Sequence, residues 1–181
     1  FDFRHQYALH TTSYENQPLS DRTFSRFRER NAAYELVTGK DLIHDCIVSL
    51  AENIRKYMDI ALEEARKAAE DSAKDVPVGC IIVNKKGEII GRGRNTRCLH
   101  GSVLGHAEIN ALEEAKNNTG SYLLEGTVMF VTLEPCPMCA GAIVQARIPK
   151  VVIGSMNPKA GCAGSVLNVL QTEGLNHQVD I

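Results

Sequence analysis

The apolar positions divide the chain into a helical first part and a mixed second part. From residue 41 onward apolar side chains recur at spacings of three and four, which predicts an amphipathic helix that extends to about residue 73. A helix of that length predicts a break or a domain seam inside it. The residues before 41 are polar and turn-prone, with an Arg-rich stretch at 21–31, and predict loops and short helices.

Beyond the long helix, short apolar runs alternate with turn residues. The β-branched or turn-bounded runs predict strands at 78–83, 88–93, 127–133, 150–154 and 176–181. Apolar spacings of three and four predict helices at 106–116, 136–146 and 165–171. This order predicts an α/β fold in which helices cover a sheet, with parallel crossovers after the first hairpin and a helical N-terminal extension.

Length and charge restrict the class of protein further. The 181 residues suffice for one full-sized domain and a modest additional segment. Twenty Lys and Arg against twenty-two Asp and Glu leave a net charge of −2, which excludes a polycation that binds nucleic acid by bulk charge alone. Because no apolar run approaches the roughly 18 residues of a membrane span and no leader pattern opens the chain, we expect a cytoplasmic protein with no membrane partner.

The six cysteines include one Cys-x-x-Cys pair, Cys136 and Cys139. Without a secretion signal a disulfide framework is not expected, and this spacing favours a metal site or redox chemistry. At the first turn of the helix predicted there, both sulfurs point to nearly the same face, and the helix N-terminus favours their thiolate forms. His106 is the candidate third ligand, which leaves one tetrahedral position open, as is typical of catalytic zinc.

Glu108, two residues after His106, is the candidate proton carrier. At the first turn of a helix it can reach the open position of the metal rather than the metal itself, where a carboxylate can move the proton of a zinc-activated water. A redox dithiol is an alternative, as is a structural site with Cys98, His100 or Cys162 as fourth ligand. The order His-x-Glu…Pro-Cys-x-x-Cys is nevertheless the signature of zinc-dependent nucleobase deaminases.

From about residue 58 to residue 181 the chain resembles the bacterial tRNA-specific adenosine deaminases of the cytidine deaminase superfamily. The matching stretches are VPVGCIIV (76–83), GRGRN (91–95), GHAEINAL (105–112), VTLEPCPMCAGAIVQARIPKVVIG (131–154), NPKAGCAGSVLNVL (157–170) and a final LNHQVDI. The resemblance implies a three-layer α/β/α cytidine-deaminase-like sheet of about five strands. It also implies one zinc ion per subunit, with His106, Cys136 and Cys139 as ligands, and no organic cofactor.

The same resemblance implies roles for five further residues. Asn95 would hydrogen-bond the target nucleoside. Val78 and the backbone of Ala107 would line the base pocket. Asn157 and Lys159 would lie on the loop that faces the RNA.

The activity that the resemblance implies is hydrolytic deamination of adenosine to inosine at the wobble position of a tRNA anticodon, with Glu108 carrying the proton of a zinc-activated water. The implied partners are the anticodon stem-loop and a second copy of the chain in a homodimer. The run Ser102–Gly105 departs from the family pattern. Together with Asn95, Arg97 and Gly101 it is similar to yeast-type cytosine deaminases, so a cytosine, free-base or nucleoside deaminase is the alternative. The chain also stops before the family's C-terminal helix, and we expect weaker RNA docking without it.

Residues 1–57 fall outside this resemblance and are expected to form a helical extension, in part disordered, ahead of a deaminase domain at 58–181. QPLSDRTFSRFRERN (17–31) and LIHDCIVSLAENI (42–54) resemble the N-terminal region of insertion-sequence transposases. We interpret the Arg-rich stretch as a solvated helix face rather than a DNA contact. A transposase-derived nucleic-acid-binding fragment with a catalytically silent zinc fold is the alternative from another class of protein.

Overall fold

The computed structural model describes residues 41–181, with side chains from residue 47 onward. The predictions for residues 1–40, including the Arg-rich stretch, lie outside the described residues. The chain divides into two compact units, and the second, Ile54–Ile181, contains the whole sheet. The expected domain boundary between residues 57 and 58 stays a prediction. Within residues 41–181, no helix is both long and apolar enough to cross a membrane.

The long helix α4 spans Asp41–Asp71 and runs for 31 residues without interruption. The helix has no break, because no glycine or proline occurs in this range and every residue can adopt helical geometry. The alternative prediction, a domain seam inside the helix, agrees with the boundary between the two compact units after Asn53. In the second unit, Met58, Ala61, Ala65 and Ala68 are buried at helical spacing. Met58 and Ala61 belong to one apolar cluster with the sheet, so this stripe is the face that α4 presents to the strands.

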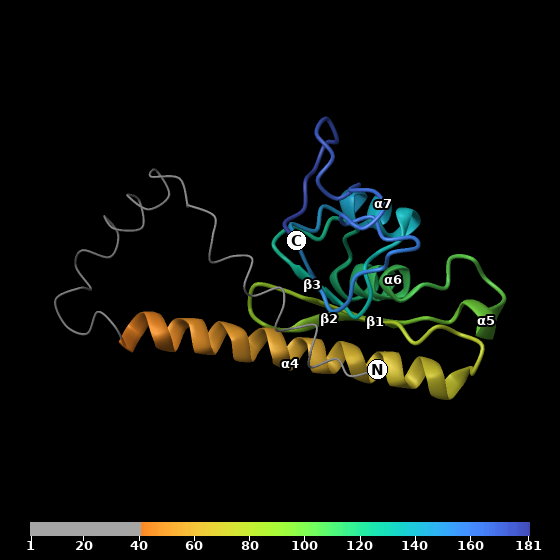
Figure 1. The fold of residues 1–181 in the computed structure, drawn as a ribbon, viewed down its shortest axis with the longest axis horizontal. Coiled ribbons are helices and arrows are strands. Elements are labelled where there is room, and N and C mark those ends of the chain that lie inside the picture. Colours follow the sequence, from red (N-terminus) through yellow and green to blue (C-terminus); the bar gives the residue numbers. More distant parts are fainter. Residues whose placement is uncertain (1–40) are drawn as a thin grey trace. The chain divides into compact units, whose positions relative to one another are not determined.

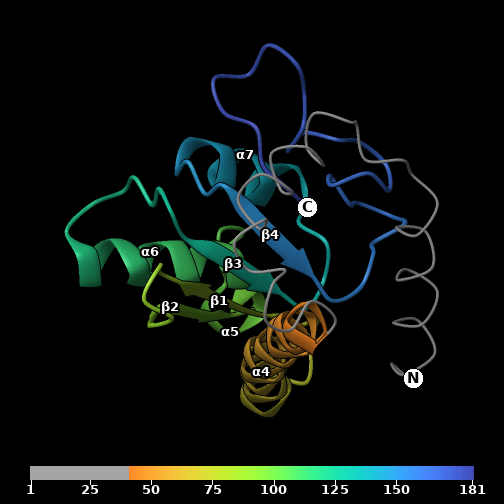
Figure 2. The same cartoon turned by 90° about the vertical axis from the view of Figure 1, so that its left-hand side faces the viewer.

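Four strands form one sheet: β1 (Gly79–Val83), β2 (Ile89–Arg94), β3 (Val128–Val131) and β4 (Lys150–Ile153). Figure 1 labels β1, β2 and β3, and Figure 2 shows the full spatial order β2-β1-β3-β4. β1 pairs antiparallel with both β2 and β3, and β3 pairs parallel with β4. β2 and β3 therefore run in the same direction, although β1 lies between them. Three shorter helices accompany the strands: α5 (Arg97–His100), α6 (Ala107–Thr119) and α7 (Pro137–Gln145). Of these, the short α5 was not predicted from the sequence.

The predicted helix at 165–171 is replaced by turns. Instead of bonding within a helix, the backbone N–H groups of Val166 and Leu167 both donate to the carbonyl oxygen of Gly161, at 3.1 and 3.2 Å. Leu170 is nevertheless fully buried, so the apolar spacing that predicted a helix reflects the packing of an irregular segment. Turn hydrogen bonds to Gly161 and the burial of Leu170 outweigh the local helical pattern here.

The predicted last strand, 176–181, contributes a single parallel bridge between Asp180 and Lys150. His177 anchors this segment by a 2.8 Å hydrogen bond from Nε2 to the carbonyl oxygen of Ile148. The described residues thus form a four-stranded sheet where about five strands were expected.

Alternating residues of β1 point to opposite faces of the sheet and contribute to two apolar layers. Cys80 and Ile82 belong to the core shared with α6 and α7, whereas Ile81 and Val83 belong to the core shared with α4. Figure 2 shows α4 on one side of the sheet and α6 and α7 on the other. The predicted three-layer α/β/α arrangement is confirmed.

Glycines on β2 let α6 approach the sheet closely. A Cβ atom on Gly93 would overlap the carbonyl oxygen of Ala107, and one on Gly91 would overlap that of Ala111. Gly79 on β1 permits the same close approach of α4 on the opposite face. The position of the N-terminus of α6 therefore depends on backbone-to-backbone packing that only glycine permits.

We expect Gly93→Ala to destabilise the protein and to displace the start of α6. The added methyl group meets backbone atoms, which cannot move aside as a flexible side chain could, and overpacking of this kind costs about 1–3 kcal/mol. Gly141→Ala is the matched control, because nothing lies within 4 Å of the Cβ position there. Alanine is also the better helix former by about 0.5–1 kcal/mol. In urea denaturation, the free energy of unfolding should fall for the first variant and should not fall for the second; equal values would contradict the prediction.

Candidate metal centre

Two helix N-termini meet at the site. α6 begins directly after His106 and α7 begins directly after Cys136, and both of these flanking residues have extended backbone angles. Pro137 occupies the first turn of α7, where its missing N–H group is not needed. Within a regular helix the side chains of His106 and Glu108 would diverge by about 200°. Because His106 stands outside the helix, both side chains face the cysteines of α7.

Three donor atoms converge there: Nδ1 of His106 and the Sγ atoms of Cys136 and Cys139. Nδ1 lies 3.6 Å from the sulfur of Cys136 and 3.5 Å from that of Cys139, and all three donors lie within 4.8 Å of one another. A tetrahedral zinc ion with Zn–N bonds of about 2.05 Å and Zn–S bonds of about 2.3 Å separates its nitrogen and sulfur ligands by about 3.6 Å. The donor set therefore fits zinc.

No fourth protein donor joins this cluster among the residues whose side chains are described. Cys98, His100 and Cys162 were candidates by composition, and none of them belongs to it. The sulfur of Cys98 instead lies 3.6 Å from the carbonyl oxygen of Lys74, and that of Cys162 lies 3.7 Å from the carbonyl oxygen of Ala160. Three protein donors would leave one coordination position of a tetrahedral zinc ion open, which is the arrangement of a catalytic rather than a structural zinc site.

The two thiols of the site are electrostatically unequal. The hydrogen bond from the side chain of Cys139 lowers the pKa of Cys136 to about 5, although burial opposes it; backbone N–H groups at the start of α7 and the ring of His106 act in the same direction. The same interaction and burial raise the pKa of Cys139. Cys136 is therefore a thiolate at neutral pH, which is the form that binds a metal, and a bound cation would favour the thiolate of Cys139 as well.

Glu108 is the buried carboxyl group beside the donors. It lies in the first turn of α6, and 4% of its surface is exposed. Burial raises the pKa of Glu108 and the negative charge of Cys136 adds to this, while its own backbone N–H, His106 and Cys139 oppose the increase. A carboxyl group whose pKa lies closer to neutrality can both accept and return a proton. The placement supports the predicted role of Glu108 as proton carrier.

The predicted pocket residues lie around the start of β1 and of α6. Val78 and Ala107 are buried in the same apolar core. Asn95 follows β2, where its Nδ2 donates to the carbonyl oxygen of Val76 at 2.9 Å and its Oδ1 accepts the N–H of Arg97 at 3.2 Å. The side chain of Asn95 is thus oriented by the backbone, and each of its polar ends keeps a hydrogen-bonding position for a ligand.

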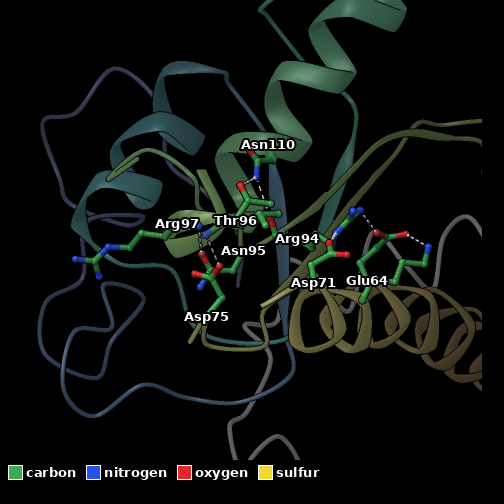
Figure 3. Close-up of polar contacts among 10 residues, drawn as sticks. Glu64, Asp71, Asp75, Arg94, Asn95, Thr96, Arg97 and Asn110 are labelled. Atoms are coloured by element: carbon green, nitrogen blue, oxygen red, sulfur yellow. Dashed lines mark hydrogen bonds and ion pairs between the residues drawn. The ribbon is translucent and has the colours of Figure 1, made fainter. Parts of the chain in front are cut away.

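Asp75, which no sequence motif reveals, holds the loop that follows β2. Its buried carboxylate accepts the N–H groups of Cys98 and Leu99 in α5, at 2.7 and 3.0 Å. Burial would raise the pKa of Asp75, but these hydrogen bonds lower it below the ordinary value. From the other side, the amide of Asn110 on α6 donates to the hydroxyl of Thr96 (Figure 3). The loop is therefore held both by the segment after α4 and by α6.

Figure 3 also shows a charged network on the other face of β2. Nε of Arg94 donates to Asp71 at 2.6 Å, and the guanidinium lies 3.8 Å from the buried carboxylate of Glu64, both on α4. Arg92 lies 3.7 Å from the same carboxylate. These contacts join α4 to an edge strand on the face opposite α6, so we assign them to stability rather than to the site.

The residues predicted to face RNA lie on the loop after β4. Oδ1 of Asn157 accepts the N–H groups of Lys159 and Ala160, at 3.2 and 3.3 Å, and so closes the turn that carries them. Backbone N–H groups of the same loop donate hydrogen bonds to Glu134. In the sequence, Glu134 is marked only by its place as an acidic residue after an apolar strand. Burial would raise the pKa of Glu134, but hydrogen bonds from Ser165 and from the N–H of Asn157 lower it.

Proteins of similar sequence include tRNA-specific adenosine deaminases. A family model described as the cytidine and deoxycytidylate deaminase zinc-binding region matches residues 51–155. The tRNA-specific adenosine deaminase of Bacillus subtilis strain 168 is 46% identical over 125 residues, which is 69% of this chain and 76% of that protein. The protein of the same name from Streptococcus pyogenes serotype M18 is 46% identical over 69% of this chain and 77% of its own length.

Solved structures of similar fold include one from a study of A-to-I editing by tRNA:A34 deaminases at the wobble position of transfer RNA. It has a TM-score of 0.65 and 36% identity, over 70% of this chain and 95% of that chain. A guanine deaminase from Bacillus subtilis has a TM-score of 0.54 and 31% identity, over 61% of this chain and 69% of that chain. The first likeness is the more extensive of the two.

Proposed function

The chain belongs to the cytidine and deoxycytidylate deaminase family, and from that premise we propose that it converts adenosine to inosine at the wobble position of a tRNA anticodon. The observation that carries the proposal is the 46% identity to a tRNA-specific adenosine deaminase across 76% of that protein. The likeness to a structure from work on tRNA:A34 deaminases supports the same substrate class. The chain is thus a zinc-dependent deaminase whose proposed substrate is tRNA.

The three donors would hold one zinc ion per subunit: Nδ1 of His106 and the sulfurs of Cys136 and Cys139. When bound there, zinc lowers the pKa of a water molecule and so makes the nucleophile available at neutral pH. Glu108 takes one proton from the attacking water and delivers it to N1 of adenine as the oxygen bonds to C6. Glu108 then moves the second proton of the water to the exocyclic nitrogen. The bond from C6 to that nitrogen breaks, and inosine and ammonia leave.

Five further residues are proposed to hold the substrate. The amide of Asn95 would bond the nucleoside through the positions that its backbone contacts leave open. Val78 and the backbone of Ala107 would line the base pocket, beside the start of α6 that carries Glu108. Asn157 and Lys159 would meet the RNA outside the pocket. The target base must leave its stack to reach the donors, and an unpaired anticodon-loop base does so at low cost.

We also propose that the chain acts as a homodimer in the cytoplasm. Large apolar side chains shortly before His106 are exposed, Val103 at 70% and Leu104 at 57%, and Leu167 is also exposed, at 55%. Exposed apolar groups of this kind are typical of surfaces that another protein covers. The five cysteines with described side chains are all free, which supports a reducing compartment. Analytical ultracentrifugation tests the dimer.

Inosine formation on an anticodon stem-loop tests the proposed activity, with purified protein of measured zinc content. We expect turnover when adenosine occupies the wobble position and none when cytidine replaces it. Activity on free cytosine or guanine alone would defeat the tRNA assignment and favour the free-base alternative. Bound zinc without turnover on any base would favour the nucleic-acid-binding fragment with a silent zinc fold.

A further inference from the structure

Glu134 is a buried carboxylate that no step of the proposed reaction uses. It lies between the end of β3 and Cys136, and 2% of its surface is exposed. Among the residues with described side chains, no lysine or arginine forms an ion pair with it. A buried charge without a counter-ion is costly unless hydrogen bonds replace its hydration. The groups that bond to Glu134 therefore indicate what it does.

Three backbone N–H groups of one loop, residues 157–165, bond to this carboxylate. Oε2 accepts the N–H of Asn157 at 2.8 Å. Oε1 accepts the N–H groups of Ala163 and Ser165, at 2.8 and 3.0 Å. Hydrogen bonds to an ionised acceptor are roughly twice as strong as those between neutral groups. One side chain thus holds the loop at its first residue and at its last.

The loop also closes tightly around the carboxylate. A Cβ atom on Gly161 would overlap Oε2 of Glu134, so the close approach requires glycine at this position. The next N–H, that of Cys162, donates to the carbonyl oxygen of Pro135 at 2.8 Å. The loop has no helix or regular strand of its own and takes its shape from residues 134 and 135, directly before the zinc-site cysteine.

A chain of contacts leads from Glu134 to the exposed end of the loop. Glu134 holds the N–H of Asn157, and Oδ1 of Asn157 accepts the N–H of Lys159 at 3.2 Å. The side chain of Lys159 is exposed and forms no ion pair within the part of the chain that the structure describes. The position of this free cation therefore depends on a carboxylate that is itself buried.

We propose that Glu134 is a positioning residue for RNA binding: its carboxylate holds the 157–165 loop in the shape that presents Lys159 to the phosphate backbone of the anticodon stem-loop. The identity of the RNA rests on the proposed function. Glu134 does not belong to the cluster of metal donors, and no contact with the base is assigned to it. A loop that is ordered beforehand spares the complex the entropy cost of ordering it on binding, so Glu134 acts on KM rather than on the chemical step.

Glu134→Gln tests the proposal. Glutamine keeps the size of the side chain but removes the charge and turns one accepting oxygen into an NH2 group that faces backbone N–H donors. We expect KM for the anticodon stem-loop to rise roughly tenfold, with kcat within about twofold of the original value and zinc content unchanged. An unchanged KM, or a fall in kcat accompanied by loss of zinc, would overturn the proposal.

Three further variants show whether the effect on KM passes through the loop. Gly161→Ala disturbs the same contact from the loop side without changing any charge and should raise KM in the same way. Glu113→Gln removes an exposed negative charge, 62% accessible, on α6 and should leave KM unchanged. Lys159→Ala should raise KM. The double variant with Glu134→Gln should have the same KM as Lys159→Ala, because both substitutions act through the contact between Lys159 and the RNA. Additive effects in the double variant would contradict the inference.

Hydrogen exchange of the wild-type protein provides a test that needs neither variant nor substrate. The amides of Asn157, Ala163 and Ser165 should exchange at least roughly tenfold more slowly than that of the exposed Met156. If these amides exchange fast in a protein that does deaminate the stem-loop, this inference is overturned and the proposed function is not. A wild-type protein that neither binds nor deaminates the stem-loop would overturn the proposed function and, with it, the RNA role of the loop.

Discussion

Glu108→Gln is expected to abolish deamination while zinc remains bound. Glutamine has nearly the same shape as glutamate and can occupy the same buried position, but it can neither accept nor return a proton. A single general acid or base contributes about 10²–10⁴-fold to the rate, and here one carboxyl group serves both proton transfers, so we expect a loss of about 10⁴-fold. Single-turnover inosine formation on the anticodon stem-loop, with zinc measured by elemental analysis, checks this result.

Glu113→Gln is the control for Glu108→Gln, because it makes the same change on the same helix at a side chain that is 62% exposed. Its rate should match that of the wild-type protein. If Glu108→Gln retains more than about a tenth of the rate, the proton passes through another group and the role assigned to Glu108 is wrong. If it loses both zinc and rate, Glu108 supports the metal site rather than the chemistry.

Cys139→Ala is expected to remove zinc and activity together. The sulfur is buried and is one of three donors, so its loss leaves only an imidazole and one thiolate. Loss of an outer-shell partner of a metal ligand already costs about 10–100-fold in affinity, and loss of a ligand itself should cost more than about 100-fold. Competition with a chelator of known affinity measures the change. Because binding of the metal stabilises the folded state, Tm should also fall.

Cys162→Ala is the matched control for Cys139→Ala. Cys162 is also buried but lies outside the donor cluster, so its replacement should cost about 1 kcal/mol of packing and leave zinc affinity unchanged. The exposed Cys98, replaced by serine, should have no effect on either quantity. Weak zinc binding by the Cys162 variant would show that this sulfur is the fourth ligand and that the site is structural. A reversible disulfide with no metal would instead favour the redox interpretation.

Much of the fold could be predicted because its signals are local. The run Gly79–Val83 is apolar throughout, and the structure buries all five of its residues because helices cover both faces of the sheet. The two cysteines could be assigned to one site because a spacing of three at a helix start places both sulfurs on one face. His106 and Glu108 were identified by residue type and by order relative to those cysteines, through the pattern and the resemblance.

Other features have no local signal. Asp75 holds Cys98 and Leu99 from more than twenty residues away, and Glu134 holds Ser165 from 31 residues away, so no window of sequence contains both partners. The helix predicted at 165–171 fails for a partly different reason: the N–H of Ser165 bonds to the distant Glu134, whereas those of Val166 and Leu167 bond to Gly161, only five and six residues away, in a non-helical turn. On grounds of length the long helix was expected to contain a break or a domain seam. Its composition contains nothing that breaks a helix, and the boundary between the two compact units lies inside it, after Asn53.

The sequence by itself determined the kind of chemistry: one imidazole, two thiolates and one carboxyl group, carried on helices that a sheet of short apolar strands supports. Only the tertiary structure decided that Nδ1 of His106 lies 3.5–3.6 Å from both sulfurs and that no fourth described donor joins them. The reason is physical. The position at which the starts of α6 and α7 meet depends on strand pairing and on the close packing of α6 against Gly91 and Gly93. These contacts join residues that are far apart in the sequence, so local patterns do not relate them.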